Sequence, residues 1–155
     1  MNDSGPPHLV AGEFETLRAF YDFQRNSFVR KVSGVTDEAA ARSLLPSDTT
    51  LLWLVNHLAF VEEYWFCHCF AGQEFVVPDY ERGPMAVSLR GYALARQRAD
   101  AILDDATDLN AECVQVGSGE IVNLRWVLGH MLEEVARHAG HADIIRELLD
   151  GETGR

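Results

Sequence analysis

Hydrophobic side chains recur every three to four residues in four long stretches of the chain, which is the spacing of one face of an α-helix. The first stretch shows this pattern at Phe14, Leu17, Tyr21 and Phe28. Clusters of Gly, Pro and Ser separate the stretches, as is typical of connections between helices. The pattern predicts four long helices, over about residues 12–32, 50–70, 89–105 and 124–149.

Residues that favour helix ends support these boundaries. Polar side chains that can cap a helix start precede three of the stretches, at Ser47–Thr49, Ser88 and Asn123. Gly72 and Gly151 follow the predicted ends of the second and fourth helices. Thr36 is placed to cap an additional short helix that extends toward Leu45 and ends before Pro46.

Four long helices joined by loops predict an all-α fold, a four-helix bundle. The segments 73–86 and 107–119 are longer than the turns of a bundle require, and long loops often carry function. A short extended piece is expected at residues 113–116. The length of 155 residues favours one domain over residues 1–155, with residues 1–10 flexible.

The chain is strongly acidic, with 13 Lys and Arg against 24 Asp and Glu and a formal net charge of −11. Proteins that bind nucleic acids usually present a basic face to the phosphates. Anionic membranes likewise attract basic surfaces. We therefore expect neither nucleic acid nor membrane as a partner.

The sequence also predicts a cytoplasmic protein. Its first residues lack the basic and apolar segments of a signal peptide. The densest apolar run, residues 51–65, contains Asn56, His57 and Glu62 and is too polar to span a bilayer. Three cysteines form no regular disulfide framework, which favours a reducing compartment.

Cys67 and Cys69 diverge by about 200° on a helix, so their sulfurs cannot share one metal there.

A polar stripe lies on the fourth helix. With His130 as reference on a helical wheel, His141 falls near 20°, Glu134 near 40° and His138 near 80°. The apolar arc of the same helix covers about 60° to 160°, so Glu134 and His138 lie at its edge or within it. An unpaired carboxylate costs several kcal/mol to bury, so an inward Glu134 requires a cationic partner.

The second helix places another polar ring among apolar neighbours. His57 is at the centre of a stripe that we expect to face the core, together with Trp53, Leu54, Val61 and Tyr64. The opposite side is expected to carry Asn56, Ala59 and Glu63. His68 shares the face of His57 but lies about 16 Å along the axis, too far for a common site.

One imidazole from the second helix and an acid–imidazole pair from the fourth form a candidate set of three metal ligands. His57, Glu134 and His138 suit Zn²⁺ or another divalent first-row metal. Three protein ligands leave a coordination position open, as in catalytic rather than structural zinc sites. Bundle cores hold metals in this way, with ligands from facing helices.

Spacing alone leaves alternatives open. Glu133 is an alternative to Glu134, and His141 is an alternative to either ligand of the fourth helix. His130 lies two turns before His138, so one metal does not easily take both. Taken singly, His57 is more typical of a hydrogen-bonded core histidine than of a ligand.

Two of these helices resemble a known family. Residues 123–154 resemble its final helix, with the pattern L-R-W-x-x-x-H-M-x-x-E-x-A-R-H-x-G-H-x-D-x-x-R-E, and residues 51–66 resemble the pattern L-x-x-L-x-x-H-L-x-x-V-E. The family is the DinB/YfiT-like metalloenzyme superfamily. The similarity is to its branch with a His, Glu, His metal site, related to mycothiol-dependent maleylpyruvate isomerases and mycothiol S-transferases.

The resemblance implies that His57, Glu134 and His138 hold the metal, with zinc favoured and nickel or iron compatible. It implies a thiol S-transferase: the metal lowers the pKa of a low-molecular-weight thiol such as mycothiol, and the thiolate attacks a small electrophile. His141 or His130 would move protons as catalytic groups. Where other branches read H-R-G-Q, this chain reads H-A-G-H, so His141 replaces a Gln.

Two further interpretations share the same fold. A metal-dependent hydrolase would use metal-bound water at the same open position. A non-catalytic, stress-related metal-binding bundle would use the ligands for stability alone. A homodimer through one helix face is compatible with each of them, and the sequence does not identify the substrate.

Overall fold

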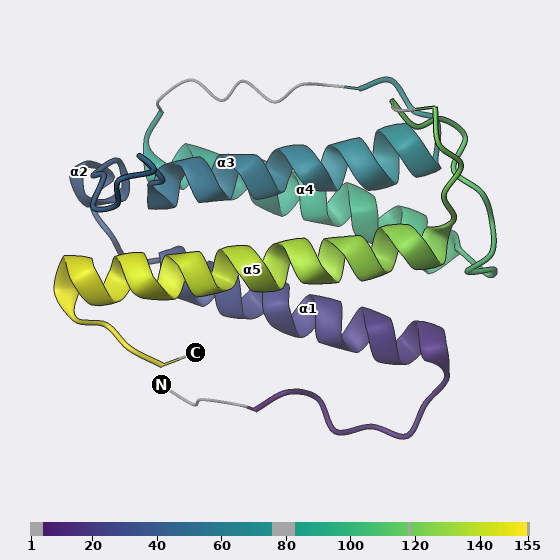
Figure 1. The fold of residues 1–155 in the computed structure, drawn as a ribbon, viewed down its shortest axis with the longest axis horizontal. Helices are drawn as coiled ribbons and strands as arrows, with labels where there is room; N and C mark the ends of the chain where they lie inside the picture. The colour runs from purple at the N-terminus through teal and green to yellow at the C-terminus, as the bar shows by residue number, and fades with distance from the viewer. Residues whose placement is uncertain (1–4, 76–82, 118, 155) are drawn as a thin grey trace.

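The structure, a computed structural model, describes residues 5–75, 83–117 and 119–154. Within these residues the chain is all-α and has no strand, and its four long helices pack as a bundle (Figure 1). The helices are α1 (Glu13–Val32), α2 (Asp37–Ala40), α3 (Leu51–Glu62), the π-helix η1 (Glu63–Phe70), α4 (Met85–Asp105) and α5 (Leu124–Asp150). The predicted four-helix bundle is confirmed. Residues 1–4 of the expected flexible start and 76–82 of the expected loop lie outside the described residues.

The predicted caps begin two of the helices. The Thr36 hydroxyl accepts a hydrogen bond from Ala39 N at the start of α2. The Asn123 side chain accepts from Trp126 N at the start of α5, at 3.0 Å. Gly151 ends α5 in the left-handed conformation, with φ +75°, which glycine adopts without strain. The cap of α3 lies one residue beyond the expected cluster, where the Thr50 hydroxyl accepts from Trp53 N.

Two boundaries differ from the prediction. The short helix α2 ends at Ala40 rather than near Leu45. Helix α4 begins at Met85, so Ser88 lies inside the helix and is not its cap. The start of α4 is held from another element, because Asp37 Oδ1 accepts a hydrogen bond from Met85 N at 2.8 Å. This tertiary cap links the beginnings of α2 and α4.

The predicted second helix reaches Phe70, but its last eight residues form a π-helix. A π-helix has hydrogen bonds from i to i+5, so it rotates its side chains away from α-helical positions. After it, Gly72 has φ +65°, and a Cβ on Gly72 would lie 2.8 Å from Val114 Cγ1. The segment 113–116, expected to be a short extended piece, lies against the end of η1, with Gln115 N donating to Cys69 O at 3.1 Å.

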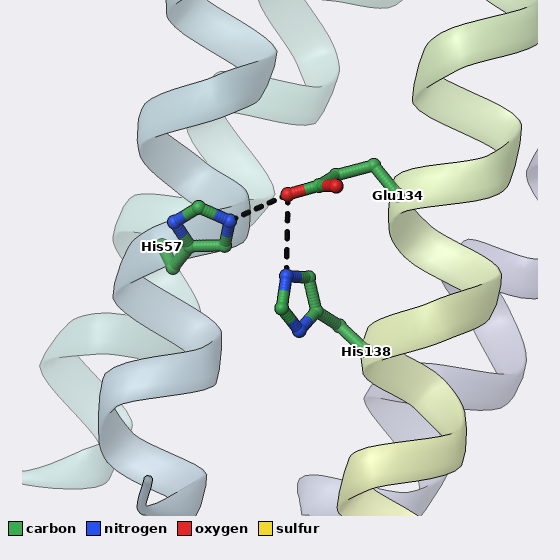
Figure 2. Close-up of side chains that lie close together, drawn as sticks. All are labelled: His57, Glu134 and His138. Carbon is green, nitrogen blue, oxygen red and sulfur yellow. Dashed lines mark hydrogen bonds and ion pairs between the residues drawn. The ribbon is translucent and has the colours of Figure 1, made fainter. Parts of the chain in front are cut away.

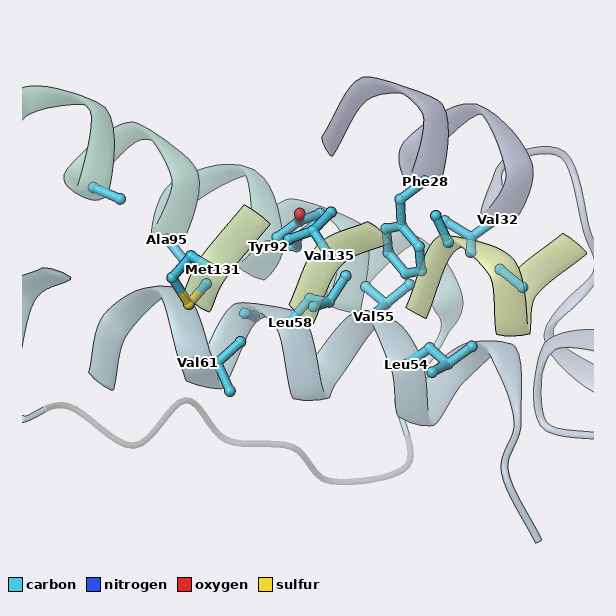
Figure 3. Close-up of a cluster of buried hydrophobic side chains, with 14 of the residues drawn as sticks. Phe28, Val32, Leu54, Val55, Leu58, Val61, Tyr92, Ala95, Met131 and Val135 are labelled. Carbon is cyan, nitrogen blue, oxygen red and sulfur yellow. The ribbon is translucent and has the colours of Figure 1, made fainter. Parts of the chain in front are cut away.

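The apolar faces of the four long helices form the core. Helix α1 packs mainly on α5 and α3 packs mainly on α4, while α3 and α5 contact each other over a shorter stretch. The residues at the centre of the bundle come from all four helices (Figure 3); they include Phe28, Leu54, Leu58, Tyr92, Met131 and Val135, all at most 1% exposed. No helix in the described part of the chain has the length and apolarity of a membrane span.

A fully buried ion pair crosses this core. Arg25 of α1 and Glu62 of α3 are both 0% exposed. The guanidinium donates from Nε to Glu62 Oε1 at 2.8 Å and from Nη2 to Oε2 at 2.9 Å. Nη1 donates to Asp22 and, at 2.7 Å, to Asp100 of α4. The Arg25 side chain therefore links α1, α3 and α4.

The surroundings keep this arginine charged. Burial by itself would lower the pKa of Arg25, but the Glu62 carboxylate opposes it and the pKa is raised. The guanidinium also lies over the Tyr21 ring, 4.4 Å from its centroid, where the face of the aromatic ring attracts a cation. Nothing in the hydrophobic pattern indicated this pair, because the pattern treats charged residues as solvent-facing.

We expect Arg25→Met to destabilise the fold by about 3–5 kcal/mol, because it leaves Glu62 buried without its partner. Urea unfolding followed by circular dichroism measures the change. Arg137→Met is the matched control, since Arg137 is 62% exposed and pairs with Glu133 on the surface. Combining Arg25→Met with Glu62→Leu should recover much of the loss. Equal stability of the Arg25 and Arg137 variants would contradict the assigned role.

Candidate metal centre between α3 and α5

Three polar side chains meet where α3 faces α5 (Figure 2). His57 comes from the middle of α3, and Glu134 and His138 lie one turn apart on α5. Glu134 Oε1 lies 2.7 Å from His57 Nε2 and 3.2 Å from His138 Nε2. One ligand atom of each residue lies within 4.8 Å of the others. The structure therefore brings together the three residues that the sequence selected.

The charge state of this cluster suits a cation. The side chain of Glu134 is 14% exposed. Burial acts to raise its pKa, but the hydrogen bond from His57 and the nearby His138 act against burial, and the pKa of Glu134 is lowered. Burial also lowers the pKa of His138 and favours its neutral form. An ionised carboxylate and a neutral imidazole are the forms that bind divalent metals.

The donor set passes a simple test of fit. The Nε2 atoms of both histidines face the same carboxylate oxygen, so three donor atoms converge from two helices. On its far side, His138 Nδ1 lies 3.2 Å from His141 Nδ1. A metal-ligating histidine usually uses its second ring nitrogen in such a bond, which fixes its tautomer and orientation. One carboxylate and two imidazoles fit zinc and several other first-row ions.

Trp53 stacks on the α3 ligand. Its ring is parallel to that of His57, with an interplanar angle of 6° and centroids 4.8 Å apart, and it meets His138 edge-on. The wheel placed Trp53 in the core-facing stripe, and this is wrong, since Trp53 is 49% exposed. The indole covers the His57 ring from the solvent side.

The opposite side of the wheel also needs correction. Glu63 is 5% exposed and Ala59 is 1% exposed, although both were expected on the side away from the core. Helix α3, with Ala59, and the π-helix η1, with Glu63, both pack on α4 as well as on α5, so two sides of each are buried. Glu63 Oε2 has its partner there, 2.8 Å from Arg98 Nη1.

The other candidate residues take different positions. His141 contacts the cluster through His138. His130 instead packs against two indoles, stacked on Trp126 at 5.0 Å and edge-on to Trp65 at 5.2 Å. The alternative ligand Glu133 pairs with Arg137 and lies 3.8 Å from His130, outside the three-residue cluster.

His68 lies apart from the cluster, as expected from its distance along the helix. Its Nδ1 is 3.1 Å from Gln73 O and 3.0 Å from Gln115 Nε2. Its ring also packs near Tyr64 and Phe75. The helical wheel gave His68 the face of His57, whereas the π-helix turns it toward the loop.

A cavity of about 270 Å³ opens beside the cluster and is lined by Trp53, Asn56, His57 and Phe60. The sequence pattern did not indicate Asn56 and Phe60 as cavity residues. The helical wheel places Asn56 on the side away from His57. No motif marks either position, so the cavity becomes evident only when α3 is packed in the bundle.

A family model described as Mycothiol-S-transferase (MST) matches residues 16–151. The matched segment contains all four long helices, apart from the first residues of α1, and the three residues of the cluster. No curated protein and no solved structure matches the chain at a significant level.

The chain's own thiols are poorly suited to act as the nucleophile. Cys67, Cys69 and Cys113 are free, and the first two are buried. Burial, reinforced by the Glu63 carboxylate, raises the pKa of Cys67 to about 12. Burial also raises the pKa of Cys113 to about 11 and raises that of Cys69. A reactive sulfur at neutral pH must therefore come from a bound thiol.

All three cysteines should react slowly with iodoacetamide in the folded protein at pH 8. A thiol with a pKa of about 12 is thiolate in about one molecule in 10,000 at that pH, and this fraction rises about tenfold for each pH unit until the pH nears 12. Mass spectrometry over time measures the modification, and urea-unfolded protein is the reactive control. Fast labelling of any cysteine in the native protein would contradict the raised pKa values.

Proposed function

Because the chain belongs to the mycothiol-S-transferase family, we propose that it joins the thiol of mycothiol to a small electrophile at a metal held by His57, Glu134 and His138. The observation that carries the proposal is the convergence of three donor atoms within 4.8 Å, from two facing helices. Zinc is the proposed ion, because the donors are nitrogen and carboxylate oxygen and three protein ligands leave an open position.

When bound, a divalent metal lowers the pKa of a thiol that it binds and so supplies thiolate at neutral pH. The protein's side chains hold the metal in position and balance part of its charge. His57 and His138 offer neutral nitrogens, and Glu134 offers one negative charge that offsets part of the charge of the ion. The sulfur loses its proton and forms a bond to the electrophilic carbon, while the bond to the leaving group breaks.

We propose that His141 assists through His138. If His138 Nε2 faces the metal, its Nδ1 carries the hydrogen and donates to His141 Nδ1 at 3.2 Å. This bond fixes the tautomer and the orientation of the His138 ring. A metal-facing Nε2 of His138 would have no free lone pair to relay a proton, so the thiol proton would pass to His141 Nε2 and not through His138. His130 is the weaker candidate for proton transfer, because its contacts are to Trp65, Trp126 and Glu133.

The proposal also covers the cellular location and the oligomeric state of the protein. A cytoplasmic location would suit an enzyme that uses a reduced thiol and carries three free cysteines. A homodimer would have an apolar face on α5, where Ile144 and Leu148 lie one turn apart and are 51% and 59% exposed.

The metal content of purified variants tests the ligand set. His57→Ala and His138→Ala should each lose the bound metal that the wild-type protein carries, since each removes one of three ligands. His68→Ala is the matched control and should keep it, because His68 lies outside the cluster. Elemental analysis after overexpression in zinc-supplemented medium gives the stoichiometry. Full metal content in both the His57→Ala and the His138→Ala variant would contradict the proposed metal centre.

His141→Ala should retain the metal at saturating concentration but bind it about 10–100-fold more weakly, as found when the hydrogen-bond partner of a ligand is removed. Its rate of mycothiol transfer should fall at full metal occupancy, with a shifted pH profile. His130→Ala tests the alternative proton carrier: it should bind the metal as the wild type does and lower the rate less than His141→Ala. Equal effects of the two substitutions would argue against a specific role for His141.

A further inference from the structure

A second and larger cavity adjoins the candidate centre. It has a volume of about 700 Å³, within the range of small-molecule sites, and it shares Trp53 and Asn56 with the smaller cavity beside His57. Asn56 directly precedes His57 in α3. The two cavities therefore meet at the point where a reacting group would approach the metal ligands.

Five of the ten residues that line the larger cavity carry polar side chains. Hydroxyl, carboxylate and amide side chains line it, at Asp37, Ser43, Asp48, Thr50 and Asn56. A lining of this kind can bind a ligand that carries many hydroxyl groups, because carboxylates accept and amides both donate and accept hydrogen bonds.

Several of these groups are held in place by contacts that leave hydrogen-bonding capacity free. Asp37 uses Oδ1 to cap Met85 N, and Ser43 Oγ donates to Asp48 Oδ1 at 3.3 Å. Each carboxylate keeps its second oxygen. The Asn56 side chain is half-buried and has no hydrogen-bond partner among the described residues. Its amide is therefore available at the junction of the two cavities.

The charge of the lining is one-sided. Asp37 and Asp48 contribute two carboxylates, and no Lys or Arg belongs to the lining within the described parts of the chain. Two nearby negative charges repel an anionic ligand and leave an uncharged polyol unaffected. Both side chains are exposed, so salt will weaken the repulsion.

This pattern distinguishes between low-molecular-weight thiols. Mycothiol carries its cysteinyl thiol on a sugar and a cyclitol, which are uncharged and rich in hydroxyl groups. Glutathione and bacillithiol carry free carboxylates instead. The cavity offers hydrogen-bond acceptors and no cationic side chain among its described residues. It therefore suits the hydroxyl groups of mycothiol and repels the carboxylates of glutathione and bacillithiol.

We propose that the larger cavity binds the hydroxyl-rich part of the thiol cosubstrate, that Asn56 contacts it, and that Asp37 and Asp48 select against thiols that carry carboxylates. The smaller cavity, with Trp53 and Phe60 in its wall, then receives the electrophile. The inference rests on the proposed transferase function. To that function the inference adds the side chains by which the protein selects one thiol cosubstrate over others.

S-methyl mycothiol separates this cavity from the metal, because its sulfur has no acidic proton to lose. Calorimetry should show that it binds metal-free wild-type protein, and that Asn56→Ala weakens binding about five- to tenfold, the cost of about one hydrogen bond. Asp105→Asn, at the far end of α4, is the control and should bind as the wild type does. Undiminished binding by Asn56→Ala, or no binding by the wild type, would overturn the inference.

Selectivity is tested with Asp48→Asn. Asp48 has φ +56°, a conformation that Asn also tolerates, so the change removes the charge with little strain. At low salt, we expect the ratio of kcat/KM for mycothiol to that for glutathione to fall severalfold, through improved use of glutathione, and the difference to shrink at high salt. An unchanged ratio would contradict the proposed selection.

The two proposals fail in different ways. If wild-type protein transfers mycothiol but metal-free protein does not bind S-methyl mycothiol, the cavity assignment is wrong and the transferase function stands. If S-methyl mycothiol binds and responds to Asn56→Ala while no electrophile in a broad panel is conjugated, the cavity stands and the proposed reaction is wrong.

Discussion

The position of α3 depends on one buried ion pair. Arg25 and Glu62 are both inaccessible to solvent, and a buried charge that loses its partner is strongly destabilising. The pair, with the contact from Arg25 to Asp100, favours the observed rotation and register of α3 relative to α1 and α4, because other arrangements would separate the buried charges. His57 is five residues before Glu62 on the same helix. The Arg25–Glu62 ion pair therefore helps to orient α3 so that the His57 ring faces α5.

That constraint explains how the bundle accommodates three polar side chains between α3 and α5. These two helices contact each other less extensively than the pairs α1–α5 and α3–α4. The Glu134 carboxylate lies between the imidazoles of His57 and His138, so the three groups satisfy one another even without an ion. A site arranged in this way needs little rearrangement to bind a metal. The larger cavity shares Trp53 and Asn56 with the cavity beside His57, so the place proposed for the rest of the thiol cosubstrate adjoins the centre.

Features of the fold and of the site that depend on residues close in sequence could be predicted from the sequence. The caps at Thr36 and Asn123 and the spacing of Glu134 and His138 depend on residues close in sequence, and the structure has them as expected. The missed features depend on residues far apart. The start of α4 is capped by Asp37 of α2, and the π-helix turns His68 away. Packing on two sides of α3 and η1 buries Glu63 of η1, whereas Trp53 of α3 is exposed. A wheel that gives each helix one buried face cannot represent such packing.

The central claim is that a thiol is activated at the three-residue centre, and cobalt substitution tests it most directly. Cobalt(II) is a spectroscopic substitute for zinc in sites of this kind. Titration of cobalt-loaded protein with mycothiol should produce a near-ultraviolet sulfur-to-cobalt charge-transfer band, absent with S-methyl mycothiol and in His57→Ala. A cobalt spectrum that does not change when mycothiol is added would contradict the account.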